Sequence, residues 1–146
     1  PASIATCVPN GNLMLEAARY EYDPENPPGV SDDFVIMGAF ADSFPVAAEG
    51  TLYVANLSYT LPVEWGPISA LTFYNDYSIL VKSEDDFEDS QINTLGCLIT
   101  AGKVYTYVDL IMGNNAQYLD GPADSFAMGE DQGWHTRFNI NVGYYF

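Results

Sequence analysis

Large apolar side chains or threonine alternate with polar or small side chains over residues 136–146. One set consists of Thr136, Phe138, Ile140, Val142, Tyr144 and Phe146, and the other of Arg137, Asn139, Asn141, Gly143 and Tyr145. A period of two predicts a β-strand with one apolar and one polar face. A tilted strand of roughly 9–11 residues crosses a bilayer, and membrane interfaces are rich in aromatic residues. We therefore predict that this segment is a membrane-spanning strand of a barrel.

Five further runs have the composition of β-strands and are separated by turn residues. They cover residues 12–22, 51–61, 68–81, 90–101 and 103–112. Gly102 indicates a tight hairpin between the last two runs, and the two prolines of residues 62–67 predict a turn. Residues 33–44 fit a strand or a long loop folded back inside a barrel about equally well. Residues 2–9 are too short and irregular to predict a strand.

The predicted connections alternate between short and long. The turns at residues 64–66 and at Gly102 are short, whereas the connections 83–89 and 113–135 are long and polar. Outer-membrane barrels have short periplasmic turns and long outer loops, so we expect Phe146 on the periplasmic side. The predicted fold class is all-β, an antiparallel transmembrane β-barrel. Because six or seven strands are fewer than the bacterial minimum of about eight, we expect this chain to form the carboxyl-terminal portion of one larger barrel domain.

The composition agrees with membrane strands and excludes one class of function. The chain has 11 Tyr, 8 Phe and 2 Trp, which suit strands and membrane interfaces. It has four basic and 20 acidic residues, and this net charge of −16 argues against nucleic-acid binding, which needs clustered Lys and Arg. The acids gather in residues 23–33, 84–89 and 120–131. We interpret these segments as solvated loops, with divalent-cation binding as the alternative.

The sequence indicates neither an enzyme nor a cofactor. His135 is the only histidine, and we interpret it as an interface residue rather than a base. Asp85 and Asp86 are adjacent acids in a loop, which is a poor place to hold two carboxylates in catalytic register. Cys7 and Cys97 are too few for a disulfide scaffold or a zinc site. We expect Cys97, within an apolar strand pattern, to be a packing residue.

Five segments of the second half resemble the carboxyl-terminal region of the phosphate-selective porin family, which comprises the polyphosphate and phosphate porins of Gram-negative bacteria and their general-porin relatives. They read FYNDYS (73–78), FEDSQIN (87–93), GKVYTYVD (102–109), MGNN (112–115) and WHTRFNINVGYYF (134–146). The resemblance implies an outer-membrane barrel of about sixteen strands, usually a homotrimer, with a water-filled pore for small hydrophilic solutes or ions. It also implies that this chain supplies only the last part of that barrel.

The alternation and the resemblance give the expected site residues. We expect the pore to be lined by Lys103, Tyr105, Tyr107, Asp109, Arg137, Asn139 and Asn141. The residues that the resemblance implies for barrel assembly are Phe138, Val142, Gly143, Tyr144 and Phe146. For each lining residue the alternative is ordinary pairing across the strands. Arg137 is the expected ion-pair partner of Asp109. No phosphate ligand is carried over, because four basic residues are too few for the ladders of Arg and Lys in phosphate-selective pores.

Two classes of function remain. The first is passive diffusion of small hydrophilic solutes or ions through the barrel, and the charge of −16 predicts cation preference or little selectivity. The alternative is a non-conducting structural or adhesive barrel whose acidic loops bind cations, lipopolysaccharide or another partner. In both cases the expected surroundings are the lipid and lipopolysaccharide of the outer membrane of a Gram-negative bacterium. A third option, ranked below these two, is a secreted soluble β-sandwich, which would dissolve without detergent.

Overall fold

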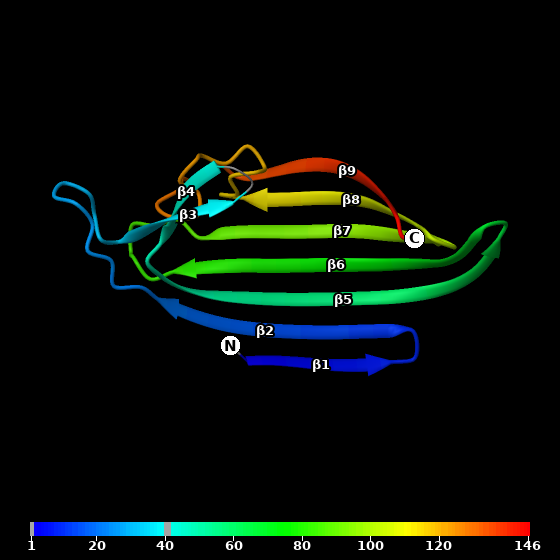
Figure 1. Cartoon of the computed structure of the whole chain (residues 1–146). Coiled ribbons are helices and arrows are strands. Elements are labelled where there is room, and N and C mark those ends of the chain that lie inside the picture. The colour runs from blue at the N-terminus through cyan, green and yellow to red at the C-terminus, as the bar shows by residue number, and fades with distance from the viewer. Residues whose placement is uncertain (1, 40–41) are drawn as a thin grey trace.

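The computed structural model describes residues 2–39 and 42–146, and these residues form antiparallel β-structure without helices (Figure 1). No helix in this part of the chain is long and apolar enough to cross a membrane. Seven strands form one sheet, in the order β1-β2-β5-β6-β7-β8-β9. Their bounds are β1 Ala2–Val8, β2 Gly11–Glu21, β5 Glu49–Trp65, β6 Ile68–Lys82, β7 Ser90–Ala101, β8 Val104–Asn114 and β9 Trp134–Tyr144. A separate hairpin follows β2 and consists of β3 (Phe34–Ala39) and β4 (Asp42–Ala47).

The short turns and the long connections lie at opposite ends of the sheet, as the sequence predicts. Within the seven-stranded sheet there are three two-residue turns, formed by residues 9–10, 66–67 and 102–103. Gly66 and Gly102 each have a φ of 61° at the first central position, as a type II′ hairpin turn requires. The long connections, which include the β3–β4 hairpin, gather at the other end (Figure 1). We call these two ends the turn end and the loop end.

Three predicted elements differ from the structure. Residues 2–9 do contain a strand, because β1 pairs with β2 from Ala2 to Val8. The turn predicted over residues 62–67 is shorter, because β5 continues to Trp65 and the register shifts between Pro62 and Trp65. Such an irregularity accommodates a proline, which has no N–H to donate to the ladder. Of the predicted segment 33–44, residues 34–39 form β3 and residues 42–44 begin β4, outside the seven-stranded sheet, and residues 40–41 lie outside the described part of the chain.

The sheet has two chemically different faces. The ladder places Leu110 opposite Phe138 and Val108 opposite Ile140, and the same alternation extends across all seven strands. We call this side the apolar face, and its exposed large side chains include Ile4, Leu13, Leu15, Leu57, Phe73, Leu95, Leu110, Phe138, Ile140 and Val142. The other side is the polar face, and it includes Asn56, Ser58, Thr60, Tyr74, Asp76, Asp109, Arg137, Asn139 and Asn141.

The buried apolar residues lie away from the middle of the sheet. Those that the structure describes as buried are all at the loop end, and they are Ala47, Ala48, Ala116, Leu119 and Ala127. Within the described residues nothing covers the apolar face, where Phe138 is 63% exposed and Val142 is 66% exposed. A water-soluble sheet normally buries one face against another layer. Among the described residues, this sheet leaves its apolar face uncovered over all seven strands.

Candidate functional site

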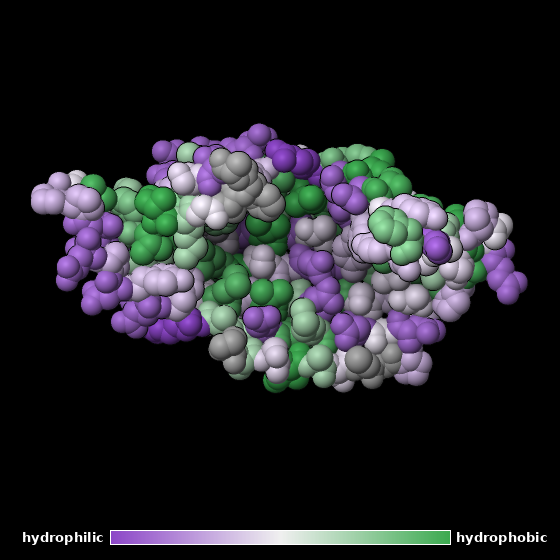
Figure 2. Space-filling view, in the orientation of Figure 1, coloured by the Kyte–Doolittle hydropathy of each residue, from purple (hydrophilic) through white to green (hydrophobic). Residues whose placement is uncertain are grey.

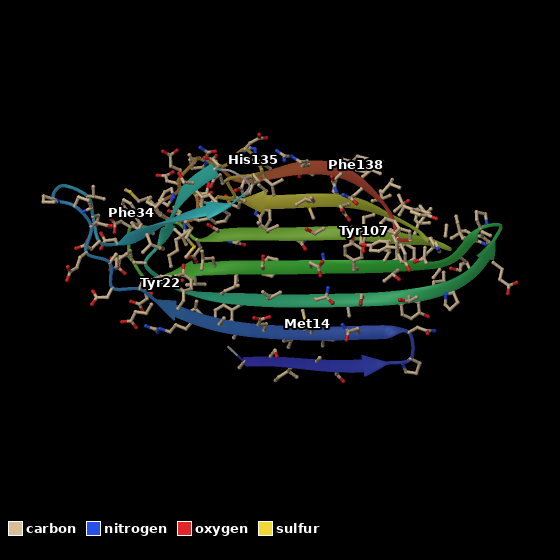
Figure 3. The ribbon with its side chains drawn as sticks, in the orientation of Figure 1. Met14, Tyr22, Phe34, Tyr107, His135 and Phe138 are labelled. Carbon is tan, nitrogen blue, oxygen red and sulfur yellow. The ribbon has the colours of Figure 1, made fainter. Side chains whose placement is uncertain are left out.

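Six of the seven predicted pore-lining residues lie together on the polar face. Tyr107 pairs with Asn141, Asp109 pairs with Asn139, and Tyr105 and Arg137 follow the same alternation on β8 and β9. Figure 3 shows Tyr107 over the face turned toward the viewer, whereas Phe138 lies along β9 at the rim of the sheet. Lys103 is separate from this group, because it is exposed in the two-residue turn that precedes β8.

The carboxylate of Asp109 is held by neutral donors. It accepts hydrogen bonds from the Tyr74 hydroxyl and from Asn139 Nδ2, the latter at 3.1 Å. The predicted ion pair with Arg137 is wrong, because none joins these two residues in the described part of the chain. Arg137 pairs across the ladder with Ile111, whereas Asn139 lies directly opposite Asp109. The register therefore gives Asp109 a neutral amide as its cross-strand partner.

A glycine on β7 allows Tyr74 to reach Asp109. Gly96 lies between them in the ladder, opposite Tyr74 on β6 and opposite Asp109 on β8. A Cβ atom at Gly96 would overlap the phenol ring of Tyr74. The ring therefore lies across β7 in the space that the missing side chain leaves, and its hydroxyl contacts the next strand. The only signal in the sequence is an isolated glycine within a strand, which is typical of close approach by another group.

The polar face carries more negative than positive charge. In the middle of the strands its acids are Glu16 on β2, Asp76 on β6 and Asp109 on β8, and Arg137 on β9 is the basic residue there. Asp76 accepts a hydrogen bond from Asn56 Nδ2 on the neighbouring strand. The face is hollowed between its two ends, and both hydrophilic and hydrophobic side chains line the hollow (Figure 2). The polar groups of this arrangement can form hydrogen bonds with water, and its carboxylates can attract cations.

At the loop end, a buried lysine joins several segments of the chain. Lys82 is the last residue of β6, and its Nζ donates hydrogen bonds to the carbonyl oxygens of Glu88 and Ser125, the latter at 2.6 Å. Burial lowers the pKa of the Lys82 amine to about 8, although nearby carboxylates act in the opposite direction. These carboxylates belong to Asp89, Asp124 and Glu88. Lys82 thus connects β6 to two long loops.

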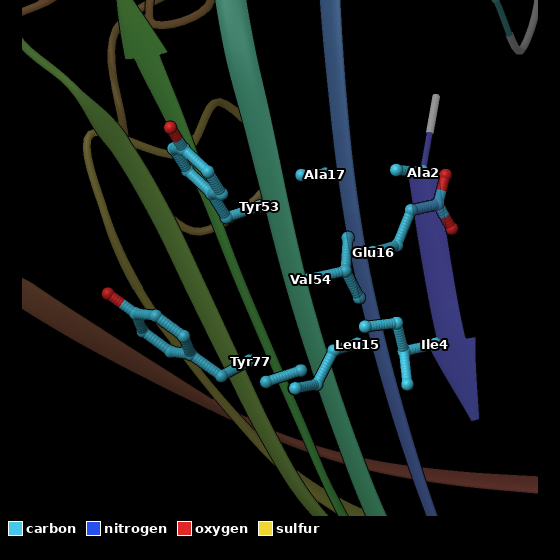
Figure 4. Close-up of a pocket in the computed structure, with 9 residues that line it drawn as sticks. Ala2, Ile4, Leu15, Glu16, Ala17, Tyr53, Val54 and Tyr77 are labelled. Atoms are coloured by element: carbon cyan, nitrogen blue, oxygen red, sulfur yellow. The ribbon is translucent and has the colours of Figure 1, made fainter. Parts of the chain in front are cut away.

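The apolar face contains shallow grooves and a few polar side chains that form hydrogen bonds with one another. One groove, of 460 Å³, crosses β1, β2, β5 and β6, where Ile4, Leu15 and Tyr53 stand around the small Ala17 (Figure 4). Polar groups on this face bond to each other, as in the 2.6 Å hydrogen bond from Asn75 Nδ2 to Asn93 Oδ1 and the 2.9 Å bond from the Tyr77 hydroxyl to Gln91 Oε1. These pairs leave fewer unsatisfied groups on an otherwise apolar surface.

The expected assembly residues do not share one face. Phe138, Val142 and Tyr144 lie on the apolar face, Gly143 lies on the polar face opposite Tyr105, and Phe146 follows the end of β9 and is fully exposed. Two other residues considered in the sequence lie on opposite faces. Cys97 is a free thiol on the apolar face, where it pairs with Phe73 and Val108. His135 lies on the polar face, and its Nδ1 is 3.9 Å from a carboxylate oxygen of Asp120.

The chemistry of the site is that of fixed carboxylates, amides and hydroxyls along a sheet. No group of three or more His, Cys, Asp and Glu side chains in the described ranges is placed to hold a metal ion. No protein family, curated protein or solved structure matches this chain.

Proposed function

We propose that this sheet is part of the wall of an outer-membrane β-barrel whose water-filled interior admits small hydrophilic solutes or ions. The observation that carries the proposal is the separation of the two faces. One face is apolar across seven strands and bare, and the other bears hydrogen-bonded polar groups and carboxylates. In a membrane barrel the apolar face contacts lipid and the polar face contacts the water inside.

The height of the apolar band supports a membrane setting. On β9 the apolar stripe begins at Trp134 and ends at Tyr144, and both are exposed aromatic residues. These ten residue steps span about 33 Å along the strand, or about 25 Å along the membrane normal at a tilt of about 40°. Tyr53 lies in the same row of paired residues as Trp134. Aromatic residues at the limits of such a band are typical of the interfaces of a bilayer.

A closed barrel would need strands in addition to those of the described sheet. The described sheet has unpaired edges at β1 and β9, and these two strands run in the same direction because every neighbouring pair in between is antiparallel. They therefore cannot pair antiparallel with each other. The proposal places further strands beside them, in a homotrimeric porin surrounded by the lipid and lipopolysaccharide of a Gram-negative outer membrane.

Planar-bilayer recording of the complete protein tests the proposed function. We expect a steady ohmic current, because ions diffuse passively through a barrel that has a hydrated polar wall. A protein that inserts into the bilayer and stays electrically silent would contradict the pore and favour a structural or adhesive barrel. A protein that remains soluble without detergent and does not insert would contradict the membrane setting itself.

We expect replacing Asp76 by Asn to weaken the cation preference of the pore. Asp76 is one of three acids along the middle of the polar face, so removing its charge lowers the local cation concentration. The expected change is a fall of about twofold in the cation-to-anion permeability ratio, measured from the reversal potential in a salt gradient. Asp86→Asn, the same change in an exposed loop, is the matched control and should have a smaller effect. Strong anion preference in the unmodified protein would contradict the assigned role of these acids.

A further inference from the structure

The segment 115–128 lies on the polar side of the sheet at the loop end. Its Ser125 carbonyl bonds to Lys82 and Ser90, which are buried residues of the polar face. Leu119 is also buried there, and a Cβ atom at Gly113 of β8 would come within 2.6 Å of Leu119 Cδ1. The segment therefore contacts the polar face directly. We call residues 115–128 the lid.

Two buried residues of the lid, Ser125 and Asn115, hold it at the loop end: Ser125 bonds to the sheet, and Asn115 bonds to Ser125 and to the loop 83–89. The Ser125 carbonyl accepts hydrogen bonds from Lys82 Nζ at 2.6 Å, from Ser90 Oγ at 2.7 Å and from Asn115 Nδ2 at 3.1 Å. Asn115 is 2% exposed, and its Nδ2 also bonds to the Glu88 carbonyl at 2.7 Å. Three donors on one carbonyl, all within a buried site, hold this part of the lid in one place.

The β3–β4 hairpin reinforces the lid from its other side. The rings of Phe44, Tyr118 and Phe126 pack together with centroid separations of 5.6–6.5 Å. The Ala47 N–H donates a hydrogen bond to the Phe126 carbonyl at 2.8 Å. Ala47 and Ala127, on either side of this contact, are both buried. The hairpin and the lid thus form one packed unit at the loop end.

We propose that the lid is a latched obstruction, which narrows the outer mouth of the pore and widens it when the ties at Asn115 and Ser125 are released. This inference rests on the proposed function, because a lid over the polar face limits flow only if that face lines a water-filled interior. The narrowing follows from the position of the lid, since the pore diameter at its narrowest point determines conductance. The latch follows from the buried side-chain ties at the Ser125 carbonyl and the Asn115 amide, to which backbone hydrogen bonds at Phe126 and Met128 are added.

The test compares Asn115→Asp with Asn114→Asp in the complete protein. The first change keeps the size of the side chain and the φ of 50° that Asn and Asp both tolerate, but it turns two donated hydrogen bonds into contacts between a carboxylate and two carbonyl oxygens. The second change adds the same charge one residue earlier, where the side chain lies on the other face and donates a 3.4 Å hydrogen bond to Asp131, outside the lid. Any repulsion that it causes therefore falls on Asp131 and leaves the ties at Ser125 in place. Both variants add one negative charge near the mouth of the pore. A difference between them therefore measures the effect of releasing the lid and not the effect of the added charge.

Two measurements are made on each variant. Hydrogen exchange of residues 115–128 reports whether the lid is released, and single-channel conductance reports whether its release widens the pore. We expect faster exchange and about a twofold higher conductance for Asn115→Asp, and neither for Asn114→Asp.

Two results would overturn the inference. The first is faster exchange in Asn115→Asp with the conductance of the control, because the lid would then open without widening the path. The second is unchanged exchange, because Asn115 would then not be a tie. Ser90→Ala, which removes one hydrogen bond to Ser125, gives the same comparison with a smaller perturbation if Asn115→Asp fails to fold. Silence of the unmodified protein and of every variant would instead contradict the proposed function.

Discussion

Replacing Phe138 by Arg is expected to lower the free energy of unfolding in a lipid bilayer by about 2–4 kcal/mol, the cost of an arginine on the lipid face near the midplane of a barrel. Phe138 lies near the middle of β9 and is 63% exposed. If the apolar face met water, an exposed position would tolerate arginine with a change of about 0.5 kcal/mol or less. The large effect at an exposed residue is therefore specific to a lipid environment. Urea unfolding in phospholipid vesicles measures it.

Asn141→Arg is the matched control for this change. Asn141 is exposed on the polar face of the same strand, three residues away from Phe138 and opposite Tyr107. We expect its effect on the unfolding free energy to be about 0.5 kcal/mol or less, since the side chain remains in water. Equal and small losses for both variants would show that the two faces meet the same solvent, and the proposed function would then fail.

Replacing Gly96 by Ala is expected to lower the free energy of unfolding by about 2–3 kcal/mol, from overpacking and a lost hydrogen bond to a charged group. The added methyl group overlaps the ring of Tyr74, which must leave its place across β7. Asp109 is only 9% exposed and then loses the Tyr74 hydroxyl, with Asn139 as its remaining side-chain donor. Urea unfolding measures the loss.

Gly143→Ala is the control, because it makes the same change on the same face of β9. There the added Cβ atom meets its nearest neighbour, Tyr145 Cε2, at 3.4 Å, which is ordinary contact. In the double variant Tyr74→Leu with Gly96→Ala, the loss of unfolding free energy should be smaller than the sum of the two single losses by about 1 kcal/mol or more. The reason is that the added methyl group no longer meets the tyrosine ring. Additive losses would mean that the ring does not depend on the glycine.

The parts of the fold that the sequence predicts are those with local causes. The alternation of residues 51–61 and 136–146 reflects the pleat of a single strand, and the structure confirms strands over 51–61 and 136–144. Tyr145 and Phe146 lie beyond the end of β9, so the predicted strand is two residues too long at that end. Gly102 predicts a tight hairpin because one residue must adopt a positive φ, and it has a φ of 61°. These signals lie within a few residues of one another, so they do not require knowledge of the register.

The parts that the sequence misses depend on pairing between distant segments. β1 has a weak periodic signal because Ile4 and Val8 are its only β-branched aliphatic residues in seven, and its strand conformation follows from pairing with β2. The contact from Tyr74 to Asp109 requires two registers at once, across β7, so no spacing in the chain reveals it. The lid likewise depends on a carbonyl group at Ser125, and a backbone atom leaves no mark in the sequence.

The most direct test is to determine which solvent each face of β9 contacts. Spin labels are attached through Phe138→Cys, Asn139→Cys, Ile140→Cys, Asn141→Cys and Val142→Cys in a variant with both native cysteines replaced by alanine, reconstituted in lipid vesicles. Collisions with lipid-soluble oxygen and with a water-soluble nickel chelate are then compared. We predict a period of two, with oxygen dominant at 138, 140 and 142 and the chelate dominant at 139 and 141. If neither reagent reaches the labels at 138, 140 and 142, these side chains lie inside a packed globular core. That result would contradict the claim that the apolar face contacts lipid.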